Sequence, residues 1–395
     1  MKRILYLTFY FEPDLCAGSF RNSPLAKTLA NKLQNLAEIE VISTLPNRYN
    51  TFSIDAPEEE QINNLKINRI AIPTHKSGMI DQVLSFKTFY SKALKISREK
   101  KYDLVIASSS RLFTAYLGYS IAKEQGIPLY LDIRDIFYDT LEDILKNNLV
   151  KKLVLPVIKK LEKQTFSYAS HINLISEGFY DYFSHYSNAN YTFIPNGIDD
   201  LFIDNFMENS EGLENCSADK SFKTIVYAGN IGEGQGLDKI IPQMAQVLGC
   251  GYKIIVIGDG GNKSKLINEI QQNNLQNVEF MPPVKRGELI NIYNEADYLF
   301  VHLNDYKAFE KVLPSKVFEL ATFPQPIIAG VSGYAAKFIR EKVDNSIIFE
   351  PCNIDDFLIQ FKNFEYKRVK RTEFVSKYKR NTINESLSSS IVNYL

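Results

Sequence analysis

Hydrophobic residues along this chain follow two alternating spacings. Short runs rich in β-branched and aromatic residues, such as residues 4–11, are followed by longer stretches in which apolar side chains recur every three or four positions, as Leu25, Leu29, Leu33 and Leu36 do. The first spacing is typical of buried strands and the second of amphipathic helices. Strands that alternate with helices predict parallel sheets covered by crossover helices, so the predicted fold class is α/β.

The alternation is interrupted once, and this divides the chain. Strands are predicted at 4–11, 39–44, 67–72, 103–108, 128–135, 171–176 and 191–195, and again at 223–229, 253–258, 278–281, 298–303, 326–330 and 346–350. Between the two sets, after Asn196-Gly197, lies an acidic and polar stretch without this pattern. We therefore expect two Rossmann-like, doubly wound domains, at 1–200 and 201–370, with a tail at 371–395 that packs back on the first.

Composition narrows the class of protein. The 46 basic side chains equal the 46 acidic ones, which gives no overall charge for attracting nucleic acid. The four cysteines are scattered, so they predict neither a disulfide framework nor a zinc site and favour a reducing compartment. No apolar stretch approaches the roughly 20 residues that span a bilayer, so we expect a cytoplasmic protein whose membrane contact is at most peripheral.

Three glycine-containing loops follow predicted strands. Gly18 lies between the first strand and a helix, Gly229 to Gly236 contains four glycines in eight residues, and Gly258-Asp259-Gly260 follows the next strand. Loops at the carboxyl ends of parallel strands bind anions when their backbone N–H groups are free. We interpret the second as a diphosphate loop, and plain surface turns are the alternative for all three.

Two charged clusters add candidate chemistry. Pro314 and Ser315 can open a helix that carries the cation of Lys316, with Glu319 one turn further on. Arg134 and Asp135 end a predicted strand, where charges are costly to bury unless they are paired or used. Asp135 could orient a hydroxyl and Arg134 could pair with a phosphate, and a structural Arg–Asp pair is the alternative.

Five short motifs stand in an order that resembles a known family. They are Ile194-Pro195-Asn196-Gly197-Ile198-Asp199, Tyr227-Ala228-Gly229-Asn230-Ile231-Gly232, Gly258-Asp259-Gly260, Phe280-Met281-Pro282-Pro283-Val284, and Pro314-Ser315-Lys316 with Glu319. With the Glu12-Pro13 and Gly18 loop, this order resembles glycosyltransferase family 4 (glycosyl transferases group 1), above all the bacterial members that build surface polysaccharides such as O-antigen and capsule. The resemblance implies a GT-B fold, with two domains facing a central cleft, and retaining transfer of a hexosyl or N-acetylhexosaminyl group from a nucleotide-diphosphate sugar, with UDP favoured, to a lipid-linked or growing saccharide.

The resemblance also assigns roles to individual positions. Glu319 matches the second Glu of the family's E-x7-E motif, which takes the ribose hydroxyls, and Ser315 and Lys316 match positions near the diphosphate and donor sugar. Gly18 matches the loop that backs the diphosphate from the first domain. The remaining donor-binding candidates are Gly229, Asn230, Gly258, Pro283, Val284, Lys285 and Pro314, where Pro283 to Lys285 match the strip that meets the base. The catalytic candidates are Asp135, Arg134 and Lys316.

Three positions depart from the family pattern. The first Glu of E-x7-E falls at Lys311, Glu233 and Gln235 replace basic residues after the Gly229 strand, and Arg134 stands where many members have a first-domain His. Phosphate neutralisation is then expected from Lys316, Arg286 and backbone dipoles. Because no Asp-x-Asp sequence is present, we expect transfer without a metal or other cofactor.

Residues 149–163 predict a basic amphipathic helix. Its apolar positions share a face that can rest on anionic lipid or on the protein core, with lysines around the rest. Two alternatives to a transferase remain from the sequence: a sugar-nucleotide 2-epimerase of similar fold, for which no cluster of first-domain carboxylates and His is found, and a non-catalytic sugar-nucleotide scaffold.

Overall fold

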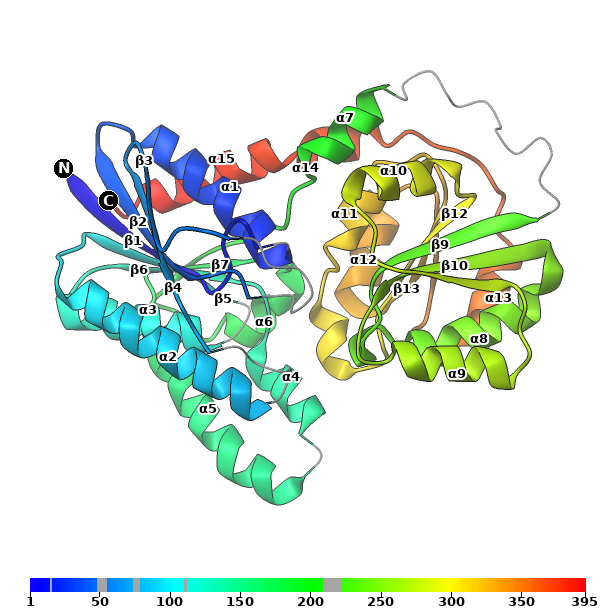
Figure 1. Ribbon diagram of the computed structural model, residues 1–395, viewed down its shortest axis with the longest axis horizontal. Coiled ribbons are helices and arrows are strands. Elements are labelled where there is room, and N and C mark those ends of the chain that lie inside the picture. The colour runs from blue at the N-terminus through cyan, green and yellow to red at the C-terminus, as the bar shows by residue number, and fades with distance from the viewer. Residues whose placement is uncertain (15, 48–54, 74–78, 110–111, 146, 209–221) are drawn as a thin grey trace. The chain divides into compact units, whose positions relative to one another are not determined.

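The structure is a computed structural model, which describes residues 1–14, 16–47, 55–73, 79–109, 112–145, 147–208 and 222–395 (Figure 1). The chain forms two compact units. Unit 1 consists of Met1–Gly197 and Asn381–Leu395, and unit 2 consists of Ile198–Arg380. The two crossing points therefore lie at residues 197 and 380, whereas the sequence pattern places boundaries after residues 200 and 370.

Unit 1 is built on an eight-stranded sheet. Its strands are β1 (Lys2–Leu7), β2 (Ala37–Thr44), β3 (Glu59–Ile62), β4 (Leu65–Ile70), β5 (Leu104–Ser109), β6 (Leu129–Ile133), β7 (His171–Leu174) and β8 (Asn190–Thr192). They lie in the order β3-β4-β2-β1-β5-β6-β7-β8. From β4 to β8 the strands are parallel, and the order reverses direction between β1 and β5, which makes this the switch point of a doubly wound sheet.

The edge strand β3 differs from the sequence prediction. It pairs with β4 in antiparallel orientation, so the first sheet is mixed and not purely parallel. Its sequence, Glu59-Glu60-Gln61-Ile62, is mostly exposed and lacks the apolar run that marks the buried strands. Charged side chains are common on edge strands because they discourage pairing with other chains.

Helices cover both faces of this sheet. They are α1 (Ala17–Lys32), α2 (Met79–Arg98), α3 (Leu112–Gln125), α4 (Phe137–Ile144), α5 (Asn148–Tyr168), η1 (Glu177–Phe179), α6 (Tyr180–Phe183) and α15 (Arg380–Val392). α1 and α15 lie on one face, whereas α2, α3 and α5 lie on the other (Figure 1). The core on the α1 side includes Leu25 and Leu29 from α1 together with Leu387 and Ile391 from the C-terminal helix.

Unit 2 repeats the arrangement in a purely parallel sheet. Its strands are β9 (Lys223–Asn230), β10 (Tyr252–Asp259), β11 (Val278–Met281), β12 (Tyr298–His302), β13 (Ile327–Gly330) and β14 (Ser346–Phe349). Their order is β11-β10-β9-β12-β13-β14. Numbered from the start of the unit this is 3-2-1-4-5-6, the order of the dinucleotide-binding Rossmann fold, with its switch point between β9 and β12.

The helices of unit 2 also form two layers. They are α7 (Asp200–Glu208), η2 (Glu233–Gln235), α8 (Leu237–Leu248), η3 (Gly249–Gly251), α9 (Lys263–Gln272), α10 (Arg286–Glu295), η4 (Lys307–Lys311), α11 (Lys316–Leu320), α12 (Gly333–Lys342), α13 (Ile354–Lys362) and α14 (Thr372–Tyr378). Figure 1 shows α8, α9 and α13 on one face of the sheet and α10, α11 and α12 on the other. The core under α8, α9 and α13 contains Ile240, Leu266 and Phe357, all completely buried.

The stretch after Gly197 corrects one expectation from the sequence. Instead of an irregular linker, Asp200–Glu208 form helix α7, which buries Phe202 and Phe206. The acidic residues that mask this helix in the sequence lie on its exposed side. Within the described ranges, no helix is long and apolar enough to cross a bilayer.

Candidate functional site

The candidate donor site lies at the carboxyl ends of β9 and β12 in unit 2. In open parallel sheets, ligands bind outside the strand ends at the switch point, because loops leave the sheet there in opposite directions. The β9 end continues into Gly229, Asn230 and η2, and the β12 end continues through Asn304 and η4 to α11. The two loops are tied together: the backbone N–H of Asn304 donates to the Gly234 carbonyl at 2.9 Å and its side-chain amide donates to the Glu233 carbonyl at 2.7 Å.

The glycine-rich loop after β9 exposes fewer amides than its sequence suggests. The N–H of Ile231 donates to the Asp259 carbonyl, that of Gly232 to the Gln235 side chain, and that of Gly236 to the Glu233 carbonyl. Asn230 donates to the same Gln235 side chain at 2.8 Å. The loop is therefore a stiff scaffold held by its own hydrogen bonds, and the expectation of many free backbone donors is wrong for these residues.

Gly258 serves chain packing at this edge of the sheet. Its φ is +142°, and a Cβ at this position would lie 1.9 Å from the Gly229 carbonyl oxygen. Its own carbonyl accepts a hydrogen bond from the Lys263 ammonium at 2.8 Å. The missing side chain thus lets the ends of β9 and β10 approach each other, which is a structural reason for the second glycine motif.

Lys316 and Glu319 form an ion pair beside this loop. The Lys316 Nζ atom lies 2.8 Å from Glu319 Oε2, and the two side chains are 28% and 19% exposed. Burial alone would lower the pKa of Lys316, but Tyr293 and Glu319 outweigh it and hold that pKa above its usual value. A charged ammonium is therefore held in place next to a carboxylate.

Helix α11, which carries this pair, is short. It spans only Lys316–Leu320, and Ser315 at its N-cap position makes no capping hydrogen bond. A single turn contributes little macrodipole. Positive charge at this site comes from the Lys316 side chain more than from the helix end.

Two tyrosines beside the pair were missed by sequence reasoning. Tyr293 on α10 is completely buried, and its hydroxyl has no hydrogen-bond partner within the described part of the chain. Burial raises the pKa of Tyr293 to about 12, and Lys316 and Glu319 both act on it electrostatically. Tyr227, on β9, also interacts with Lys316 and donates from its hydroxyl to the Asn230 carbonyl at 2.6 Å. No local motif marks them, because both look like ordinary core aromatics in the sequence.

The strip predicted to meet the base lies at the carboxyl end of β11. Pro283 and Lys285 are exposed and Val284 is half-buried, and Lys285 occupies the N-cap position of α10. β11 is two strands away from β9 in the sheet. At about 4.8 Å per strand, the strip lies roughly 10 Å from the end of β9.

Arg286 and His302 have structural partners. Arg286 forms an ion pair with Asp199, which Arg380 also approaches, at 3.4 Å. Burial would raise the pKa of Asp199, but the two guanidinium groups lower it below its usual value. The expectation that Arg286 is available for phosphate is therefore not supported by its contacts.

The imidazole of His302 lies between the Gln235 carbonyl at 2.6 Å and the Cys352 N–H at 3.0 Å.

In unit 1, the cluster that ends β6 is arranged differently from a simple Arg–Asp pair. Asp132 is bound on both oxygens by Arg21 of α1, at 2.8 Å each, and also accepts from Asn173 and Ser108. Arg21 reaches on to the carbonyls of Pro195 and Ile194. The partner of Asp132 is thus Arg21, 111 residues away, and not the neighbouring Arg134.

Arg134 and Asp135 follow in the loop between β6 and α4. The Arg134 guanidinium lies against the first turn of α1, where a Cβ on Gly18 would be 3.1 Å from Nη1. Its Nε atom is buried without a partner among the described residues. Burial raises the pKa of Asp135 to about 6. Gly18 and Arg134 therefore lie against each other at the carboxyl end of the first sheet, and Asp135 is the next residue along the chain.

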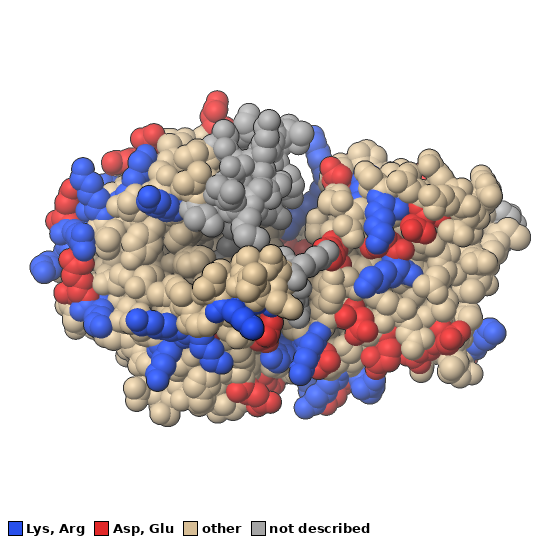
Figure 2. Space-filling model, turned by 90° about the horizontal axis from the view of Figure 1, so that it is seen from below, with Lys and Arg blue, Asp and Glu red and all other residues tan. Residues whose placement is uncertain are grey.

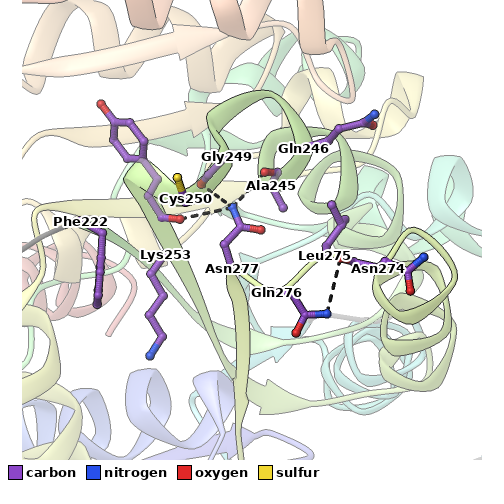
Figure 3. Close-up of a pocket in the computed structure, with 11 residues that line it drawn as sticks. Phe222, Ala245, Gln246, Gly249, Cys250, Lys253, Asn274, Leu275, Gln276 and Asn277 are labelled. Carbon is purple, nitrogen blue, oxygen red and sulfur yellow. Dashed lines mark hydrogen bonds between the residues drawn. The ribbon is translucent and has the colours of Figure 1, made fainter.

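A cavity elsewhere in unit 2 is not the donor site. It has a volume of about 480 Å³ and lies at the amino ends of β9 and β10, near Phe222 and Lys253 (Figure 3). Its wall is closed by the Asn277 side chain, which donates to the carbonyls of Ala245 and Gly249 at 2.9 and 2.8 Å. This edge of the sheet is opposite to the strand ends where parallel sheets bind their ligands.

The fold is that of the GT-B glycosyltransferases, as predicted. The E. coli trehalose-6-phosphate structure "bound with UDP-2-fluoro glucose" superposes with a TM-score of 0.71 at 11% identity, over 100% of both chains. The "lipopolysaccharide outer core galactosyltransferase WaaB" gives 0.62 at 13% identity, again over 100% of both chains. WaaG, "a glycosyltransferase involved in lipopolysaccharide biosynthesis", gives 0.65 at 12% identity over 98% of this chain and 99% of its own.

Sequence comparison matches a family model to the second half of the chain. Residues 214–382, nearly the whole of unit 2, match the family model "Glycosyl transferases group 1", which confirms the resemblance inferred from the motifs. A 95-residue segment is 34% identical to the "Putative colanic acid biosynthesis glycosyl transferase WcaI" of Escherichia coli (strain K12). That segment covers 24% of this chain and only 23% of the relative's length.

Proposed function

We propose that this protein is a glycosyltransferase that moves a sugar from a nucleotide-diphosphate sugar, with UDP favoured, to a saccharide hydroxyl. The observation that carries the proposal is the Lys316–Glu319 ion pair beside the switch point of a sheet in Rossmann order. The pair offers a cation for a diphosphate and a carboxylate for ribose hydroxyls, and neither charge is left unpaired before the ligand arrives.

We assign the parts of such a donor to residues of unit 2. The strip from Pro283 to Lys285 would meet the base, Glu319 the ribose, and Lys316 the diphosphate. The strip lies roughly 10 Å, two strand spacings, from the end of β9, and Lys316 follows the next strand, β12, so a nucleoside with its phosphates could extend along these strand ends. The buried hydroxyl of Tyr293 is a further group that a bound donor could engage.

For the chemical step we propose retention at the anomeric carbon without a metal ion. Lys316 would stabilise the negative charge that develops on the leaving diphosphate. The leaving phosphate can itself take the proton of the acceptor hydroxyl, so no separate base is required, and Asp135 would orient that hydroxyl.

The biological setting we propose is assembly of a surface polysaccharide in the cytoplasm, on a lipid-linked or growing saccharide. The relative named for colanic acid biosynthesis and the fold relatives named for lipopolysaccharide biosynthesis support this setting.

Binding of UDP to the full chain tests the donor site. Calorimetric titration of Lys316→Met or Glu319→Gln should show UDP affinity reduced about tenfold or more, because each change removes a hydrogen bond to a charged group. The ion pair of Lys253 and Glu279 supplies a matched control, since it lies at the opposite edge of the same sheet with a 2.6 Å separation. Lys253→Met should bind UDP like the unchanged protein; equal effects of both pairs would refute the assignment.

Turnover distinguishes a transferase from the alternatives. The protein is incubated with a panel of UDP-sugars, with and without saccharide acceptors, and released UDP is measured. A transferase releases UDP only with acceptor, and NMR of the product reports the anomeric configuration. An epimerase would change the sugar without release, and a scaffold would bind without any change, so either result would overturn the proposal.

We further propose that α5 rests on an anionic lipid surface. Four apolar side chains near its start are exposed to solvent: Leu149 at 73%, Val150 at 39%, Leu153 at 75% and Val157 at 56%. Lys152, Lys160 and Lys163 are exposed beside them, while Leu155 and Ile158 face the core. Figure 2 views the side on which this end of α5 lies and shows basic side chains set among uncharged surface. An apolar stripe bordered by lysines is typical of helices that lie in a membrane interface.

Vesicle co-sedimentation tests this surface. Wild type should bind vesicles containing phosphatidylglycerol and not phosphatidylcholine alone, with weaker binding at high salt. A Leu149→Ser, Leu153→Ser double variant should lose binding yet keep its UDP affinity. Ile359→Ser, at an exposed apolar position in unit 2, is the control. Undiminished binding of the double variant would exclude α5 as the contact.

A further inference from the structure

The cavity at the amino ends of β9 and β10 is a second candidate binding site in unit 2. Its volume of about 480 Å³ lies in the range of roughly 300 to 1,000 Å³ that small-molecule pockets span. Strand β10 is eight residues long, so at about 3.3 Å per residue the cavity lies roughly 25 Å from the carboxyl ends of the sheet. A ligand in this cavity and a donor at the carboxyl ends therefore do not compete for the same residues.

Side-chain amides form much of the wall of this cavity. Asn277 donates to three backbone carbonyls between residues 245 and 252, at 2.8 to 3.3 Å, so its position is fixed. Gln246 and Asn274 also line the cavity, are exposed, and make no side-chain hydrogen bond to any residue that the structure describes. Each carboxamide can both donate and accept. The wall thus combines one rigid amide with two that are available to a ligand.

The other part of the wall is apolar. It is formed by Phe222, Ala245 and Leu275. Figure 3 shows Phe222 and Lys253 on one side of the Asn277 side chain and Leu275 on the other. A sugar ring has C–H groups on its faces and hydroxyls around its edge, so it matches an apolar surface that is flanked by amides.

The charge at this cavity is already neutralised. Among the described residues that line it, Lys253 alone carries a charged side chain, and its Nζ atom lies 2.6 Å from Glu279 Oε2. The same ammonium lies 5.8 Å from the centre of the Phe222 ring. A phosphate or nucleotide would have to compete with Glu279 for this cation. The lining therefore favours an uncharged ligand that carries hydroxyl groups.

A second hollow continues from this cavity along α8. It has a volume of about 330 Å³, lies between α8 and α9, and shares Gln246 with the cavity. Asp238 and Lys265 in its wall form an ion pair at 2.8 Å. Its other charged residues within the described ranges, Lys239 and Glu269, have opposite signs. Two neighbouring hollows with balanced charges suit an elongated neutral ligand of several sugar units.

We infer that the cavity and the second hollow together bind a segment of a neutral oligosaccharide. The amides would bind its hydroxyl groups, and the apolar wall would pack against the faces of its rings. Such a site would keep a growing saccharide attached to the protein between transfer steps and raise its local concentration. This role rests on the proposed transferase function, whereas the site itself rests on its own lining.

Cys250 gives a direct readout of occupancy, because its exposed thiol lines the cavity. The full chain is treated with iodoacetamide, and mass spectrometry measures the alkylation rate of Cys250 with and without neutral trisaccharides of glucose, galactose or mannose. At least one trisaccharide should slow alkylation in a saturable manner, and UDP should leave the rate unchanged. Full-rate alkylation with every trisaccharide, or protection by UDP, would overturn the inference.

Variants locate the binding residues. Gln246→Ala and Asn274→Ala should each weaken binding of the protecting trisaccharide about threefold to tenfold in saturation-transfer NMR, because each removes an uncharged hydrogen-bonding group. Gln272→Ala is the matched control, since Gln272 is an exposed amide on α9 that lines neither hollow. Equal losses in all three variants, or no loss in the first two, would refute the assignment.

The outcomes separate this site from the proposed function. If a trisaccharide protects Cys250 but the protein does not bind UDP, the proposed function fails and the site survives. If UDP binds and no trisaccharide protects Cys250, only the site fails. Alkylation that slows at higher protein concentration without any sugar would assign the cavity to contacts between copies of the chain, and would likewise overturn the inference.

Discussion

Single buried charges in unit 1 have distinct roles, and Asp132 is the clearest structural one. It is 1% exposed and receives four hydrogen bonds, two of them from Arg21. Removal of one member of a buried ion pair leaves the other uncompensated. Asp132→Asn should therefore lower the free energy of unfolding by about 3 kcal/mol in urea titrations. Asp103→Asn, which loses the exposed pair with Lys2, should cost less than about 1 kcal/mol, and similar losses for both variants would contradict this account.

Asp135 should set the acid limb of the pH profile. Burial raises the pKa of Asp135 to about 6, so the carboxyl gains a proton below that pH. The protonated carboxyl can no longer use both oxygens to accept a hydrogen bond from the hydroxyl group of the sugar acceptor. We expect kcat/KM to fall about tenfold per pH unit below pH 6. NMR titration of the carboxyl carbon measures the same pKa directly. An acid limb that persists unchanged in Asp135→Asn would assign it to another group.

At the scale of elements, the close approach of the ends of β9 and β10 depends on the missing side chain of Gly258. Gly258→Ala would place a methyl group 1.9 Å from the Gly229 carbonyl oxygen, so the backbone must move. We expect lower stability and weaker UDP binding, since the shifted loop also carries Asn230. Gly261→Ala is the matched control, because its Cβ would meet no atom within 4 Å. Calorimetry with UDP and thermal unfolding check both, and equal behaviour of the two variants would argue against the clash.

The strands and helices also show which features can be predicted from the sequence alone. Hydrophobic spacing predicts the apolar strands and the parallel sheets, and the predicted fold is confirmed. The edge strand β3 and helix α7 were missed because their acidic side chains hide the periodicity. Lys316 and Glu319 were named from a local motif, but their pairing, the nearby Tyr293 and the engagement of Arg286 by Asp199 depend on tertiary contacts between distant segments.

At the scale of the whole molecule, the C-terminal segment completes unit 1. Leu387 and Ile391 of α15 are 1% and 0% exposed within the core that contains β1, β2 and α1. Leu387→Ala should therefore cost about 3 kcal/mol, through lost burial and the cavity that remains. Denaturant unfolding of the full chain, compared with Leu36→Ala at a 65% exposed position, measures the difference. A cost similar to that of Leu36→Ala would show that α15 contributes little to the core.

Unit 2 begins and ends at neighbouring points of the chain. The Ile198 N–H donates to the Tyr378 carbonyl at 2.8 Å, and the Arg380 N–H donates back to the Ile198 carbonyl at 3.0 Å. A continuous segment whose two ends lie side by side resembles an inserted domain. Such a segment can be removed or exchanged while the chain on either side stays connected over a short distance. Recombination at these two adjacent points could therefore transfer unit 2, with Lys316 and Glu319, into another chain and leave the remaining residues of unit 1 in place.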